Sequence, residues 1–458
     1  MNAYAPARAD VDVVAVAPRA RQRDREIVDT ILAPLSVTPR FWRVAFSICI
    51  AGTALWVVTV AYTVWAGIGV WGNNIPVAWA FAIINFVWWI GIGHAGTFIS
   101  AFLLLLNQSW RAAVSRMAEA MTVVAVAIAG TFPLLHLGRP WFFYWLAPYP
   151  ATMGVWPNFK SALAWDVVAI AAYFLVSVLF FYLGLVPDLA TARDRLSGRR
   201  RRQVYGVFAL GWSGAGSQWR RRRGGLKIIA AIVAALVVSV HSIISLDFSI
   251  AQLSGWHSTI FPPYFVLGAL YSGFAMVIAL AIVVRAAYGL QSIITLDHFD
   301  RLARLLLTIG LLITYCYIVE LYLAAGSSDP LERATHLVHW PFGPFGWLYW
   351  LMLALNVLTP QLFWFGRFRR SVPALFGASI AILVGMWIER FVIIVASLAQ
   401  GALPSSWFDY VPTWVDWGIL AGSLSIFGLV FLLFLRFVPV AAISELRREH
   451  FEKAVDAQ

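Results

Sequence analysis

Ten long stretches of mostly apolar residues run through the sequence, and each is long enough to cross a lipid bilayer as a helix, which takes about 20 residues. These stretches cover residues 44–70, 77–106, 117–137, 162–186, 228–249, 263–285, 303–325, 346–366, 374–399 and 415–437. The runs are continuous and do not alternate as barrel strands do. The sequence therefore predicts an all-α integral membrane protein with about ten transmembrane helices, which form one membrane domain over 44–437 between tails at 1–43 and 438–458.

The composition supports this prediction and excludes an ordinary soluble enzyme. Only 12% of the residues are charged and 61% are hydrophobic, whereas soluble domains carry about 25% charged residues. The net charge is +12, which could suggest nucleic-acid binding, but no RNA-binding fold accompanies the arginines. We therefore expect no nucleic-acid partner.

The distribution of lysine and arginine predicts the orientation, because cytoplasmic loops carry an excess of both. With the N-terminus inside, 30 of the 34 basic residues fall in cytoplasmic segments, and eleven of them lie in the loop 187–227. The opposite side holds Arg139, Lys160 and Arg333. We therefore expect both tails in the cytoplasm. We interpret the basic loop as a topology signal, with a docking surface for anionic lipid or a partner as the alternative.

The loops on the other side are aromatic and poor in charge, as segments 139–160, 255–264, 336–347 and 403–414 show. Aromatic residues also form belts at membrane interfaces, which is the simpler interpretation. However, extended loops this apolar are poorly suited to water. We expect a partner protein to cover them.

The chain offers few ligands for a redox cofactor of its own. Cys49 and Cys316 stand singly in apolar runs, no CxxC motif occurs, and no predicted span contains the two histidines that a b-type haem helix commonly supplies. We expect no haem, iron–sulfur cluster or metal on this chain. If electrons move, an organic carrier must deliver them and a partner must receive them.

Ionisable residues inside the predicted spans are candidates for function, because a charge at the bilayer centre costs about 2.5–3.5 kcal/mol on insertion scales. They are His94, Glu119, His136, Asp166, His241, Asp247, Glu320, Glu389 and Arg390. His136 ends one span and Asp166 begins the next, so the two should lie at nearly one depth. We interpret them as a proton-accepting pair; a structural hydrogen bond between neighbouring helices is the alternative.

Other intramembrane groups could carry protons. His241 and Asp247 lie about 9 Å apart along a serine-containing helix, which suits a hydrated path, although serine-mediated packing would explain the same pattern. Glu389 and Arg390 point about 100° apart, so we expect each to find a partner on another helix, with Arg390 pairing to Asp166 or Asp247. A purely structural buried pair is the alternative.

The remaining candidates are open between two interpretations. His94 lies on a glycine-rich helix. Its two interpretations are a residue that lines a ligand-binding site and a buried core histidine. Glu119 begins a span. Its two interpretations are a carboxylate that is stabilised by the positive end of the helix dipole and an inner proton entrance. Glu320 is an interfacial carboxylate or part of an outer path.

Several motifs resemble those of a known family. The runs GIGVWG, NFVWWIGIGHAG, FPLLHLGRPW, SLDF, GWHSTIFPPYF and MWIERFVIIV resemble the ActC membrane subunit of bacterial alternative complex III, a member of the NrfD/polysulfide-reductase membrane-subunit family. The resemblance covers roughly 41–438. It implies two stacked four-helix bundles with flanking helices in a bacterial inner membrane, and His136, Asp166, Asp247 and Arg390 match family motif positions. A sister subunit, ActF, shares many of these motifs.

The resemblance also implies an activity. We expect a quinol-oxidising subunit that does not turn over alone and that passes electrons to an iron–sulfur subunit and on to c-type haem subunits, with menaquinol or ubiquinol as substrate. The expected quinol-binding residues are His136, Asp166, Arg390 and His94, and the expected proton path runs through Asp247, His241, Glu389, Glu320 and Glu119. Two other functions remain open: a secondary transporter of a small solute or ion, and an ActF-like scaffold that binds lipid and other subunits.

Overall fold

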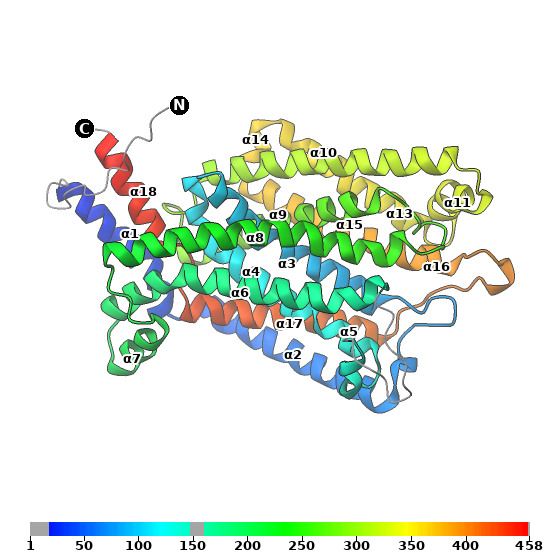
Figure 1. Ribbon diagram of the computed structural model, residues 1–458, viewed down its shortest axis with the longest axis horizontal. Helices are drawn as coiled ribbons and strands as arrows, with labels where there is room; N and C mark the ends of the chain where they lie inside the picture. Colours follow the sequence, from blue (N-terminus) through cyan, green and yellow to red (C-terminus); the bar gives the residue numbers. More distant parts are fainter. Residues whose placement is uncertain (1–17, 147–159, 457–458) are drawn as a thin grey trace.

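The computed structural model describes residues 18–146 and 160–456, and within these ranges it contains helices and no strands (Figure 1). Among the described residues, nine helices are long and apolar enough to cross a membrane. Their bounds are α2 (Arg40–Ala66), α3 (Phe81–Leu105), α4–α5 (Ser115–His136), α6 (Ala162–Arg195), α8 (Gly216–Ser249), α9 (Phe261–Tyr288), α10 (Leu296–Gly326), α15–α16 (Val372–Ala399) and α17 (Trp414–Phe437). The predicted all-helical membrane fold is confirmed.

Within the described ranges, the predicted span at 346–366 is the one that belongs to a bent helix pair. It consists of α13 (Gly346–Leu353), a π turn (Ala354–Leu358) and a 3-10 turn (Thr359–Trp364). Together with the segment Pro330–Phe342 it forms a pair bent by 86°. Pro341 and Pro360 lack the backbone N–H that a continuous helix needs. The sequence analysis missed this break.

The helices form two four-membered rings. The first bundle contains α3, α4, α6 and α8, in which each helix packs against two others of the ring. The second contains α9, α10, the segment 346–364 and α15, and it joins the first where α9 packs against α3 and α8. The helices α2 and α17 pack together on the flank of the first bundle, beside α4. Among the two cysteines, Cys316 is buried and Cys49 is half-buried, and both are free thiols.

Both ends of the described chain lie on one side of the bundle. Helix α1 (Pro18–Ser36) packs against α18 (Ile443–Asp456), as Figure 1 shows. We call this side the tail end, and the side with the loops 67–80, 250–260 and 400–413 the loop end. Termini on one side require an even number of crossings, so the bent segment completes ten. Residues 1–17 of the N-terminal tail and 147–159 of the aromatic loop lie outside the described residues.

Glycines on α3 set how closely the first bundle packs. A Cβ on Gly96 would lie 2.2 Å from the carbonyl oxygen of Ala118 on α4, and one on Gly93 would lie 2.6 Å from the Val126 side chain. These two glycines therefore let α3 approach α4 closely.

We expect Gly96→Ala to lower the stability of the bundle by about 1–3 kcal/mol, because the new methyl group meets backbone that has no rotamer to move away. Gly377→Ala on α15 is the matched control, since nothing lies within 4 Å of its Cβ; it should be neutral or slightly stabilising. Thermal unfolding of the detergent-solubilised protein compares the two. Equal melting temperatures for both variants would contradict this account of the packing.

Candidate functional site

Two carboxyl groups meet at the loop end of the first bundle. Asp166 lies one turn into α6, Asp247 lies near the end of α8, and their side chains are hydrogen-bonded to each other. Two carboxyl groups can share such a bond only when one of them holds a proton. The Oδ1 atoms of both have no hydrogen-bond partner among the described residues. This pair can therefore hold one proton and still offers oxygen atoms to a ligand or to water.

His136 lies at the same end, but no hydrogen bond joins its Nδ1 to Asp166 within the described residues. It is the last residue of α5 (Thr131–His136), and its ring packs against Trp71, with ring centroids 6.0 Å apart. Its Nδ1 is buried and has no hydrogen-bond partner within the part of the chain that the structure describes. The alternative of a structural hydrogen bond between these two residues is therefore not seen in the described part of the chain, since α5 packs against α2, α3 and α4. Their role as a proton-accepting pair stays a prediction.

The loop that supplies Trp71 is fixed to the flanking helix. Trp71 Nε1 donates to Thr63 Oγ1 at 3.1 Å, and Gly72 N donates to Asp416 Oδ2 at 2.8 Å. Asp416 also completes the capping box of α17 by accepting from Thr413 N. Asp416 is a buried carboxyl that the sequence analysis did not select. A Thr followed three residues later by Asp before an apolar run was the available signal.

Two histidines meet in the middle of the first bundle. His94 on α3 and His241 on α8 are both fully buried, and their Nδ1 atoms are 2.6 Å apart. One ring must donate its Nδ1–H, and the other must accept through an unprotonated Nδ1. The Nε2 atoms have no hydrogen-bond partner among the described residues. The sequence named both residues but gave no reason to pair them.

Tyr173 on α6 packs against this histidine pair. Its ring centroid is 4.4 Å from that of His94, and its hydroxyl donates to the carbonyl oxygens of Gly93 and His94 at 3.1 and 3.3 Å. Thr97 and Ser177 add hydroxyl groups beside it. The sequence analysis missed Tyr173, because one tyrosine in an apolar helix carries no distinguishing pattern.

A buried ion cluster closes the tail end of the first bundle. Arg116 donates to Glu119 at 2.6 Å and to Asp188 at 3.1 Å, and all three side chains are at most 2% exposed. Ser100 on α3 hydrogen-bonds to Glu119. Glu119 is therefore neutralised by Arg116 rather than simply placed at a helix N-terminus. Arg116, which counts among the basic residues of the cytoplasmic segments, is thus buried and paired rather than exposed.

The C-terminal helix covers this cluster. Asp188 accepts from the backbone N–H of Ser444 at 3.0 Å, and Glu445 pairs with Arg111 at 2.5 Å. Burial alone would raise the pKa of the Glu445 carboxyl, but Arg111, Arg116 and Arg222 outweigh it and hold the pKa below its usual value. The charge of Glu445 thus stabilises the docked α18.

We expect α18 to loosen in acid. A lowered pKa in the folded state means that the stabilising effect of Glu445 is complete at neutral pH and is lost as the pH falls through that lowered pKa. Hydrogen exchange of residues 443–450 should therefore speed up as the pH is lowered, after correction for intrinsic rates, and Glu445→Gln should show the faster exchange already at pH 7. The control is Glu26→Gln at an exposed position of α1, which should leave the exchange rate of residues 443–450 unchanged. Identical protection in E445Q and the unchanged protein would contradict this role.

Arg390 does not reach the carboxyl pair of the first bundle. It is buried on α15, where it contacts the neighbouring Glu389, and its guanidinium lies 4.9 Å from the centroid of Phe265. The expectation that Arg390 pairs with Asp166 or Asp247 is therefore wrong. Long side chains can fold back toward each other even when their Cα–Cβ bonds point 100° apart, and the sequence argument neglected this freedom.

Glu389 belongs to a polar group inside the second bundle. It accepts from the Tyr317 hydroxyl on α10, and Asn356 Nδ2 in the π turn of the bent span lies 2.9 Å from the same hydroxyl. The sequence analysis selected Glu389 but missed Tyr317 and Asn356. Their signal was weak, because single tyrosine and asparagine residues occur in many membrane helices.

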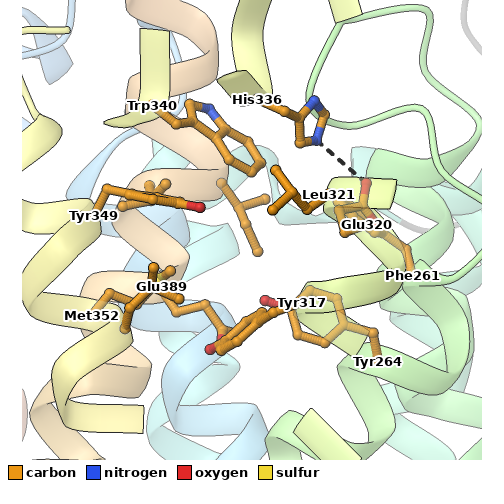
Figure 2. A pocket seen from close by; sticks show the side chains of 13 residues that line it. Phe261, Tyr264, Tyr317, Glu320, Leu321, His336, Trp340, Tyr349, Met352 and Glu389 are labelled. Atoms are coloured by element: carbon orange, nitrogen blue, oxygen red, sulfur yellow. Dashed lines mark hydrogen bonds and ion pairs between the residues drawn. The ribbon is translucent and has the colours of Figure 1, made fainter. Parts of the chain in front are cut away.

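A cavity adjoins this group near the loop end of the second bundle (Figure 2). Figure 2 shows aromatic rings of Tyr317, Trp340 and Tyr349 around it, with the pair His336–Glu320 at one edge. The imidazole Nε2 and the Glu320 carboxylate are 3.4 Å apart, and Ser258 donates to Glu320 at 2.9 Å. The cavity has room for a few water molecules.

The fold and these intramembrane groups define a polytopic helical membrane protein with buried proton-binding residues in two bundles. Comparison with protein families gives the assignment. Residues 69–402, well over half of the chain, match the family model described as polysulphide reductase, NrfD. The chain belongs to this family, and the membrane-subunit family expected from the motifs is confirmed.

The names of individual relatives are those of reductase subunits. The chain is 22% identical over 424 residues to a protein of Halobacterium salinarum described as a membrane subunit of dimethyl sulfoxide reductase, a match that covers 84% of this chain and 91% of the relative. It is 21% identical over 384 residues to a selenate reductase subunit of Mesobacillus selenatarsenatis, covering 79% and 86%. A shorter match, 32% identical over 103 residues, links 22% of this chain to 24% of the menaquinone reductase integral membrane subunit of Nitratidesulfovibrio vulgaris.

Proposed function

We propose that this chain is the quinol-oxidising integral membrane subunit of an oxidoreductase complex of the alternative complex III type, with His136 and Asp166 at its quinol site. One observation carries the proposal: a buried imidazole nitrogen without a hydrogen-bond partner among the described residues and a proton-sharing carboxyl pair lie at the same end of one bundle. The name of the menaquinone reductase relative supports a quinone as the ligand.

The residues present suit a quinol, which supplies two electrons and two protons when it is oxidised. His136 Nδ1 can accept a hydrogen bond from one hydroxyl and take its proton, since it has no competing partner among the described residues. The Asp166–Asp247 pair can accept a second proton when its own is released outward. Each electron leaves to an acceptor outside this chain, for which we propose an iron–sulfur subunit followed by c-type haem subunits.

Exposed aromatic and aliphatic side chains at the loop end support such a partner. Trp65, Ile75, Phe408, Val411 and Trp414 are all exposed there, Ile75 almost completely at 98%. We propose that the iron–sulfur protein lies over this surface, within electron-transfer reach of the site below it. An ActC-like position, beside a sister chain of the same family, fits the motifs better than the ActF-like scaffold.

We propose that the tail end faces the cytoplasm of a bacterial inner membrane. The basic residues of α7 (Arg199–Phe208) and of the first turns of α8 lie at this end, as the excess of positive charge on cytoplasmic loops requires (Figure 1). The loop end then faces outward, so the protons taken from quinol are released on the outer side.

Proton translocation across the whole membrane is a further part of this proposal. Glu119, the His94–His241 pair and Asp247 follow one another through the first bundle, and Glu389 and Glu320 line the cavity in the second. His241 and Asp247 are about 9 Å apart along α8, so water must bridge them. In vesicles that contain the complex, pumping predicts more protons outside than the two that each quinol releases. A ratio of two would exclude pumping and leave quinol oxidation intact.

Bound quinone tests the proposed site directly. The complex, purified through a tag on this chain and extracted with solvent, should contain about one quinone per chain, and His136→Ala should remove it. His257→Ala is the control, because His257 is an exposed histidine at the same end. Quinone that persists in H136A would overturn the assignment of the site. Solute uptake by the chain alone in liposomes would favour a transporter instead, a class in which broken helices like the bent span are common.

A further inference from the structure

The short helix α7 combines two kinds of surface that the quinol site does not use. Its first turn consists of four arginines, Arg199–Arg202. Its second half exposes apolar side chains: Val204, Val207 and Phe208 are 54%, 72% and 53% exposed, and Leu210 follows with 67%. A helix that is basic at one end and apolar at the other is suited to the boundary between lipid tails and headgroups.

Hydrogen bonds hold α7 at a fixed depth beside the first bundle. The Tyr182 hydroxyl on α6 donates to the carbonyl oxygen of Phe208 at 2.8 Å, and the Tyr205 hydroxyl donates to that of Phe437 on α17 at 3.0 Å. Tyr182 lies about 16 Å before Arg193 along α6, so the apolar half of α7 reaches the level of the membrane-spanning residues. The arginine half lies farther out, near the end of α6.

A hollow of about 830 Å³ opens at this arginine half, lined by Arg193, Arg195, Arg199 and Arg202, with Ser197 and Gln203 as further donors. Asp194 is the one acidic residue that lines it, and it pairs with Arg193. No ion pair joins Arg195, Arg199 or Arg202 to another residue in the described part of the chain. The hollow is therefore strongly positive, because its one carboxylate cannot neutralise four arginines.

We propose that this hollow binds the phosphate headgroup of an anionic phospholipid whose acyl chains lie along the apolar half of α7. Arginine matches phosphate geometry with two parallel hydrogen bonds, and basic clusters next to membrane helices attract anionic lipids. The charge of the hollow selects an anion, and the exposed Val207 and Phe208 beside it select a lipid over a soluble phosphate. A headgroup with two phosphates, as in a diphosphatidylglycerol, fits the number of arginines best. The inference rests on the membrane fold and is independent of the quinol chemistry.

Lipid retention by the intact complex tests the proposal. In native mass spectrometry of the complex from nanodiscs, we expect diphosphatidylglycerol to remain bound and phosphatidylcholine to be lost. Arg199→Gln with Arg202→Gln should weaken retention roughly 30-fold, since each basic residue near the surface contributes about a factor of five. The control is Arg23→Gln with Arg25→Gln, which removes two exposed charges from α1 at the same end and should change nothing.

A charge-conserving variant and a labelling experiment test the same proposal. Arg199→Lys with Arg202→Lys keeps the charge and should retain most of the lipid, which separates headgroup binding from misfolding. A photoreactive anionic lipid should label residues 193–210 in the intact complex. Equal retention in the glutamine variant, equal retention of phosphatidylcholine, or displacement of the lipid by millimolar inorganic phosphate would each overturn the proposal. Loss of lipid in both the glutamine and the lysine variants, with no labelling of 193–210, would overturn it as well.

Discussion

Asp166→Asn is expected to lower kcat/KM for quinol oxidation by about 100- to 1,000-fold, the range that loss of a general base produces. Asparagine has nearly the shape of aspartate and can still donate a hydrogen bond to Asp247, so the fold of the loop end should survive. However, it cannot take a proton. The effect should therefore fall on turnover, while bound quinone and assembly of the complex change little.

The control for this variant is Asp409→Asn, which neutralises an exposed carboxylate at the same end. It should leave turnover unchanged. Steady-state oxidation of a short-chain quinol by the purified complex, with its natural electron acceptor, gives kcat and KM. Wild-type turnover in D166N would remove the carboxyl pair from the mechanism, and a matched loss in D409N would point to a surface effect instead.

Arg116→Met should cost about 3–5 kcal/mol of unfolding free energy, because it leaves Glu119 and Asp188 as buried charges without a partner. Arg116 also donates to the carbonyl oxygen of Gly184 at 2.5 Å, and Gly184 has no room for a side chain because its Cβ would lie 2.1 Å from the guanidinium. The arginine thus connects α4 to α6 and positions the residues that receive the C-terminal helix.

The triple variant R116M, Glu119→Gln and Asp188→Asn separates charge from packing. If R116M loses unfolding free energy because its carboxylates are unpaired, neutralising them should restore much of that free energy. Thermal or denaturant unfolding of all variants in the same detergent measures this. Arg23→Met, at an exposed position of α1, should have little effect. A triple variant no more stable than R116M would show that the cluster acts through shape rather than charge.

The sequence was sufficient for the long apolar helices and for the end of each helix at which a polar group lies, because apolar length and a rise of 1.5 Å per residue determine both. It placed His136 and Asp166 at one end of the membrane. It could not choose their partners. Which carboxyl faces Asp166 depends on the rotation of α8 against α6, and this rotation is set by packing across the whole bundle. The same limit hid the His94–His241 contact.

The errors in the second bundle have a related cause. Arg390 was assigned to a distant carboxylate because adjacent residues point apart, but its long side chain folds back toward Glu389. The bent span was predicted as a straight helix because hydropathy does not register a π turn such as Ala354–Leu358. Arg116 was counted as loop charge because its burial depends on Asp188, 72 residues later.

Photolabelling with a quinone that carries an azido group tests the central claim most directly, because it shows where the ring binds in the intact complex. The account predicts that labelled peptides come from the loop end of the first bundle, from residues 131–138 and 162–173, and that excess natural quinol suppresses the labelling. Label confined to residues 317–353, around the cavity of the second bundle, would contradict it.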